Sequence, residues 1–245
     1  VKILRYLWVD YRFEAVGATA RGLANLSFPV RDLFKELATA GKRHGLHAAS
    51  GSLKVGGNVR LNVLAIVFQS VGLPGEYFKA RFVMWLRAKG LLDKVRLDLQ
   101  RQDTSLATEL QDMYVSDALA EALLAADPTL AGGIADVHQL LAAEYPKVND
   151  VTIDETVEAI RKALTVSRRF PCTLVVLDEI QQHIGEDAEA SRRSYAVQEI
   201  AEACSSRFDG KLMLVGTGQS ALTDTPLLQK LMGRFTIPIL SLIHI

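Results

Sequence analysis

Cysteine is scarce in this sequence, with Cys172 and Cys204 the only two thiols among 245 residues. One precedes an expected buried strand and the other falls on the apolar side of an expected helix, so both fit buried thiols better than a disulfide. The five histidines form no zinc-ligand pattern with them. Two buried thiols without a disulfide fit a reducing compartment, and we expect a cytoplasmic protein.

Long apolar runs and net charge are also lacking. No stretch reaches the ~18 uninterrupted apolar residues of a membrane-spanning helix. Lys and Arg total 28 and Asp and Glu total 28, so the formal net charge is zero. A chain with zero net charge has no overall positive charge that would attract nucleic acid or an anionic membrane. Any DNA binding must therefore come from local clusters or from other domains.

A phosphate-binding loop of the form G-x-x-x-x-G-K-[ST] is absent as well. The nearest imitation is segment 51–57, where the lysine, Lys54, stands in the wrong place. Its glycine content favours a flexible loop. The backbone cradle that such a motif gives to phosphates is therefore missing from this sequence.

The clearest positive signal is segment 173–179, in which a mostly β-branched and aliphatic run leads directly into Asp178 and Glu179. Such a run suits a parallel strand buried on both faces, and sheets of this kind bind ligands at the carboxyl ends of their strands. One carboxylate there can hold Mg²⁺, and a second can orient or deprotonate a water. The alternative is a buried strand followed by a solvated turn.

A second apolar run at 211–215 again stops at small and polar residues, among them Thr217 and Gln219. Between the two runs, segment 195–208 carries apolar residues at helical spacing. Strand, helix and strand in this order predict two parallel strands whose polar tips lie at one edge of the sheet.

Arg234 stands between an expected helix at 226–231 and a short expected strand at 236–239. A guanidinium group is planar and permanently charged, so it can meet two phosphate oxygens at once. The alternative is a surface arginine at a helix C-terminus.

Taken together, these segments resemble the second half of an AAA+ ATPase core. The resemblance implies an α/β P-loop NTPase fold, with a parallel sheet flanked by helices, that binds ATP and Mg²⁺. It assigns Mg²⁺ to Asp178 (Walker B), water activation to Glu179 and γ-phosphate sensing to Thr217 (sensor 1). It further implies nucleotide contact by Gln219, and an arginine finger, Arg234, offered to the next subunit of a homo-oligomer.

Segments 60–68, 176–185 and 215–219 are similar to the large P-loop ATPases of BREX phage-defence systems, the BrxC/PglY type. This likeness covers most of the chain and implies other defence-system proteins as partners. One departure is His183, where that family usually has tyrosine.

Four parts are expected along the chain: the start of the ATPase core at 1–59, a helical insertion at 60–168, the Walker B half at 169–239 and a tail at 240–245. The tail matches a translated mosaic-end adapter of sequencing libraries, and such scars are excluded from fold reasoning; the alternative is an ordinary hydrophobic strand. Because the chain begins with valine and its first residues resemble the helix after a P-loop, we expect an internal fragment with that loop just upstream.

Local signals place some boundaries. We expect a strand near 46–49 and helices through most of the insertion. Ser116 and the pair Thr152 and Glu155 have the form of helix starts, the latter as a capping box. The charged segment 185–194 is expected either to contact a neighbouring subunit, DNA or a partner protein, or to be a solvated surface loop.

We therefore expect part of an ATP-hydrolysing enzyme, with the fragment inactive alone. One alternative is a nucleotide-binding switch or scaffold without turnover. A second is a motor ATPase that DNA stimulates, which steep salt dependence would reveal.

Overall fold

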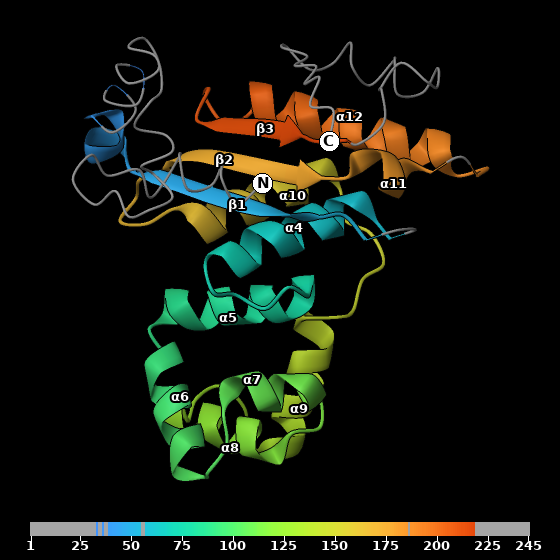
Figure 1. Cartoon of the computed structure of the whole chain (residues 1–245). Helices are drawn as coiled ribbons and strands as arrows, with labels where there is room; N and C mark the ends of the chain where they lie inside the picture. The colour runs from blue at the N-terminus through green and yellow to red at the C-terminus, as the bar shows by residue number, and fades with distance from the viewer. Residues whose placement is uncertain (1–32, 34–35, 37–38, 55–56, 186, 219–245) are drawn as a thin grey trace. The chain divides into compact units, whose positions relative to one another are not determined.

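The computed structural model describes residues 33, 36, 39–54, 57–185 and 187–218. It divides into two compact units (Figure 1), one formed from residues 1–70 and 150–245 and the other from residues 71–149. The first unit contains the sheet and the second is helical.

The sheet has three strands, β1 (Leu46–Ser52), β2 (Cys172–Asp178) and β3 (Leu212–Gly216), in the order β1-β2-β3. Both pairs are parallel, with Ser52 opposite Asp178 and Leu177 opposite Gly216. The carboxyl ends of all three strands therefore meet at one edge, and for β2 and β3 this confirms the prediction from the strand-helix-strand order.

Strand β2 is central and buried, since the side chains from Thr173 to Leu177 are at most 4% exposed. Ala48, Leu174 and Val176 form a buried apolar cluster against which Val215 packs. Burying each large aliphatic side chain contributes about 1.5–3 kcal/mol. Strand β2 is apolar along its length because it lies between β1 and β3 and is buried. Its prediction as a buried parallel strand is confirmed.

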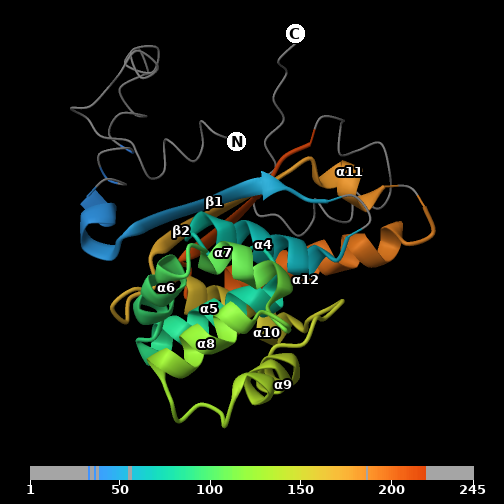
Figure 2. The same cartoon turned by 90° about the horizontal axis from the view of Figure 1, so that it is seen from below.

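Helices α4 (Val59–Ser70), α10 (Ile153–Leu164) and α12 (Ala190–Ser206) flank the sheet and contact one another. Helix α4 packs on β1 (Figure 2), and α12 packs on β3 (Figure 1). Helix α12 supplies the expected connection between β2 and β3. The fold is therefore a mixed α/β arrangement with a parallel sheet and flanking helices.

Helix α10 begins as its sequence predicts. The Thr152 side chain accepts from the Glu155 backbone N–H, and the Glu155 carboxylate accepts from the Thr152 N–H, so the capping box is confirmed. Val157, Ile160 and Leu164 recur at helical spacing and are buried. This stripe is what holds α10 in the sheet unit.

Arg60, at the start of α4, joins two other parts of the sheet unit. Its Nε and Nη2 donate to Glu199 of α12, and its Nη1 donates to Asp150 at 3.1 Å. Burial opposes the charge on Arg60, but its hydrogen bonds to Glu199 and the negative charges of Glu199 and Asp150 outweigh burial and raise the pKa of Arg60. Asn58 also donates to Asp150, at 2.6 Å. Asp150 is thereby held where the chain returns from the helical unit.

The helical unit has its own core. Its helices are α5 (Tyr77–Lys89), α6 (Leu92–Arg101), α7 (Leu106–Glu109), the 3₁₀ turn η2 (Leu110–Asp112), α8 (Asp117–Ala126) and α9 (Ile134–Glu144). Phe82, Leu99 and Leu123 are fully buried. The Phe82 ring packs edge-on against Tyr145, with centroids 5.4 Å apart. Ser116 caps α8 as expected, accepting from Leu119 N–H.

The helical unit is shorter than the insertion expected at 60–168. Helix α10 and nearly all of α4 lie inside those bounds, yet both group with the sheet unit, because α4 packs on β1 and α10 packs on α4 and α12. Membrane-spanning length and apolarity are not found in any helix among the described residues.

Cys172 and Cys204 both lie in the sheet unit and are not joined in a disulfide. Cys204 lies in α12 and is buried, which raises its pKa to about 12. A thiol with so high a pKa stays protonated at neutral pH and packs as a small apolar group.

Candidate functional site at the carboxyl edge of the sheet

Asp178 and Thr217 meet at the carboxyl edge of the sheet. Asp178 is the last residue of β2 and Thr217 follows β3, and the Thr217 hydroxyl donates a hydrogen bond to Asp178 Oδ1. A backbone hydrogen bond joins the same two chain segments, because Thr217 N–H donates to Leu177 O at 2.9 Å. Both side chains are half-buried. The structure thus brings together two of the side chains that the sequence placed at one edge.

Glu179, the next residue, has left-handed backbone angles, with φ 55° and ψ 44°. A residue with a Cβ is strained there by roughly 1–3 kcal/mol, and such strain gathers at functional sites. Glu179 turns the chain from β2 directly into α11 (Ile180–Ile184), at whose N-cap position it stands without a side-chain capping hydrogen bond. Its carboxylate group therefore follows Asp178 on a sharply defined turn and is half-buried.

Helix α11 is attached to its surroundings at three points. Ile180 N–H donates to Thr217 O at 3.1 Å. The His183 ring contacts Lys54 O at 2.6 Å through Nδ1. Arg193 donates to Ile184 O from Nε at 2.9 Å and from Nη2 at 2.7 Å. The turn that carries Glu179 is therefore fixed from both neighbouring strands and from α12.

The contacts of Arg193 were not expected from the sequence. Segment 185–194 is expected from the sequence to be a charged loop, either contacting a partner or solvated, but α12 begins within it at Ala190. The Arg193 side chain is only 13% exposed and pairs with Asp187. The hydrogen bond from Arg193 lowers the pKa of Asp187. Helical spacing after residue 190 would have been the signal for an inward-facing arginine.

The expectation of a flexible loop over 51–57 is wrong for Gly51 and Ser52, which belong to β1. Gly51 pairs with Leu177. A Cβ on Gly51 would lie 2.9 Å from Cγ1 of Ile66. Glycine at this position therefore reflects the close approach of α4 to the strand, and not chain flexibility.

Gln219 and Arg234 lie outside the described residues. The expected nucleotide contact and arginine finger are therefore not placed by the structure, and they remain predictions.

The oxygen donors at this edge suit a particular kind of metal. Within the described ranges no group of three or more His, Cys, Asp or Glu side chains could hold a metal ion by itself. Mg²⁺, however, keeps several waters and is bound through one or two carboxylates together with substrate phosphates. The Asp178 carboxylate beside the Thr217 hydroxyl fits that donor set, and it does not fit zinc.

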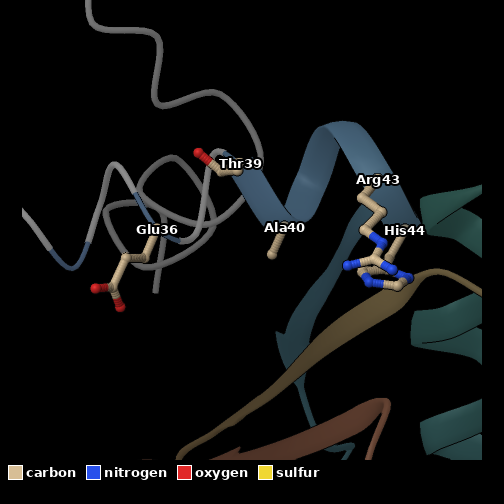
Figure 3. A pocket seen from close by; sticks show the side chains of 5 residues that line it. All are labelled: Glu36, Thr39, Ala40, Arg43 and His44. Carbon is tan, nitrogen blue, oxygen red and sulfur yellow. The ribbon is translucent and has the colours of Figure 1, made fainter.

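A hollow of about 420 Å³ lies elsewhere in the unit, lined by Glu36, Thr39, Ala40, Arg43 and His44 (Figure 3). These residues precede β1, whose other end reaches the carboxyl edge. A seven-residue strand spans roughly 20 Å. The hollow is therefore separate from Asp178 and Thr217.

Comparison of the chain with protein-family models, with curated proteins and with solved structures found no match. Function must therefore be inferred from the chemistry of this edge.

Proposed function

We propose that this chain forms part of an AAA+-like P-loop ATPase that binds ATP with Mg²⁺ and hydrolyses the γ-phosphate. The observation that carries the proposal is the hydrogen bond from Thr217 to Asp178 beside Glu179, at the carboxyl edge of two adjacent parallel strands. Ligands of parallel sheets bind at such edges.

Each side chain has a defined task in this proposal. Asp178 would hold Mg²⁺ through its water shell, and the ion would offset negative charge on the phosphates. Glu179 would orient the attacking water and accept its proton. Thr217, already bonded to Asp178, would exchange that partner for the γ-phosphate and so report nucleotide occupancy.

The backbone around Glu179 favours this proposal over a solvated turn. A solvated turn after β2 does not require a helix fixed from three sides, whereas left-handed angles alone also occur in exposed turns of this molecule, at Asp103 and Asp209. Glu179 has left-handed angles, and Ile180 and His183 are both bonded to the ends of neighbouring strands. Rigid support of this kind is what a catalytic group requires.

The proposal also requires parts that the described residues do not supply. With no G-x-x-x-x-G-K-[ST] motif in the sequence, another segment must cradle the phosphates. We propose that Arg234 completes the site of a neighbouring copy and that Gln219 contacts nucleotide. We also propose that the protein acts in the cytoplasm with other proteins of a BREX phage-defence complex.

The test is Glu179→Gln in the full-length protein. The amide keeps the shape of the side chain but cannot accept a proton, so turnover is lost while nucleotide binding persists. Glu121→Gln, an exposed position in α8, is the matched control and leaves turnover unchanged. Binding without turnover in the wild type would favour a nucleotide switch instead. A DNA-dependent rise in rate with a steep salt dependence would favour a motor.

A further inference from the structure

We infer that His183 is a positioning residue, whose ring holds helix α11 and thereby keeps Glu179 placed for hydrolysis. The catalytic part of this inference rests on the proposed ATPase function. The anchoring part rests on contacts in the structure alone.

Helix α11 cannot hold its own conformation. It has five residues, and a single helical turn is unstable unless other parts of the protein support it. It also follows directly on Glu179, whose left-handed backbone is strained. The orientation of Glu179 therefore depends on the tertiary contacts of the residues that follow it.

His183 is the only residue of this helix whose side chain makes one of the three attachments described above. Its side chain is 1% exposed, and its Nδ1 lies 2.6 Å from Lys54 O. A carbonyl oxygen only accepts hydrogen bonds, so Nδ1 must carry the proton and donate. The other ring nitrogen, Nε2, is buried and has no hydrogen-bond partner in the part of the chain that is described. Among the described residues, the ring therefore forms a hydrogen bond through Nδ1 alone.

The accepting carbonyl connects this contact to the sheet. Lys54 follows β1 by two residues, and the last residue of β1, Ser52, is paired with Asp178. The hydrogen bond from His183 therefore ties the continuation of β2 to the continuation of its neighbour β1. Ile180 is tied in the same way to Thr217 beyond β3. Glu179 thus lies on a segment held from both sides.

The charge state of the ring agrees with this role. Burial lowers the pKa of His183, the Lys54 carbonyl raises it, and the positive charge of Arg193 lowers it. The net effect is downward, so the ring stays neutral at physiological pH. A neutral ring with its proton on Nδ1 suits a contact that must stay constant through the reaction cycle.

Two amide substitutions separate the donor from the bulk of the ring. In His183→Asn the amide nitrogen stands near the place of Nδ1, so a donor to Lys54 O is kept. In His183→Gln the amide is one bond further out, near the place of Nε2, and that donor is lost. Full-length protein with His183→Asn should keep kcat near wild type. A displacement of about 1 Å costs up to about 100-fold, so His183→Gln should lose roughly 10- to 100-fold in kcat with KM nearly unchanged.

Hydrogen exchange on the same proteins gives a readout that needs no ATPase activity. Backbone amides from 180 to 185 should exchange faster in His183→Gln than in His183→Asn or the wild type. Equal exchange in all three proteins overturns the anchoring role. Faster exchange with unchanged kcat overturns the positioning role and leaves His183 a structural residue. A wild type without turnover overturns the proposed ATPase function and the catalytic part of this inference, while the exchange result still decides the anchor.

Discussion

Thr217 donates a hydrogen bond from its side chain to Asp178, so the tips of two neighbouring strands are joined at the one edge where parallel strands bind ligands. Glu179 follows directly on a strained turn. The chemistry proposed for this chain depends on these three residues.

The Thr217 hydroxyl can be tested with two substitutions of similar size. Thr217→Val removes the donor to Asp178, whereas Thr217→Ser keeps it. A hydrogen bond to a charged group is worth about 1.5–3 kcal/mol, so the valine variant should lose roughly 10- to 100-fold in the ATPase rate of the full-length protein. The serine variant should stay close to wild type. Equal ATPase rates in the two variants would show that the Thr217 hydroxyl has no role in hydrolysis.

The left-handed backbone of Glu179 predicts an inverse relation between stability and activity. Glu179→Gly removes the Cβ and should raise the free energy of unfolding by about 1 kcal/mol. Glu179→Ala keeps the Cβ and should bring no such gain, although both variants lose hydrolysis. Urea unfolding of the two variants measures the difference. Glycine and alanine variants of equal stability would show that the turn is not strained.

The close approach of α4 to β1 predicts a coupled pair of substitutions. Gly51→Ala places a Cβ 2.9 Å from Ile66 Cγ1, and overpacking of this kind costs about 1–3 kcal/mol. Adding Ile66→Ala removes the obstructing atoms, so the double variant should be more stable than the sum of the two single effects. A double-mutant cycle by thermal unfolding measures this coupling, and strict additivity would contradict the packing described.

Glu109 predicts a pH dependence of stability in the helical unit. Hydrogen bonds from Ser116 and Thr104 lower the pKa of Glu109 in the folded state. Its contribution is therefore fully present above the unfolded value of about 4.3 and is lost as the pH falls through the lower folded value. Glu109→Gln should destabilise the protein at pH 7 and much less near pH 3, measured by urea unfolding at both pH values. The exposed Glu121→Gln serves as control, and an equal loss at both pH values would rule out this linkage.

The sequence predicted the elements whose signals are local. The apolar run before Asp178, the helical spacing that led to α12 and the capping box of Thr152 and Glu155 all depend on near neighbours, and all appear in the structure. The meeting of Asp178 with Thr217 could be expected because parallel strands end at the same edge.

Contacts between distant residues could not be predicted in this way. Arg193 and His183 act through backbone carbonyls that only the folded chain brings near. Gly51 reads as a loop residue until the approach of Ile66 is known. The helical unit is shorter than its apolar pattern suggested, because periodicity shows that a helix is amphipathic but not which unit its apolar side joins.

The central claim is that Glu179 activates water for ATP hydrolysis, and phosphate release at saturating Mg²⁺ and ATP tests it most directly. Wild-type and Glu179→Gln full-length proteins are measured side by side, with bound nucleotide determined on the same samples. We predict steady turnover in the wild type, a loss on the order of 100-fold or more in the variant, and equal nucleotide binding in both. Equal rates in the two proteins, or nucleotide binding without any turnover in the wild type, would contradict the claim.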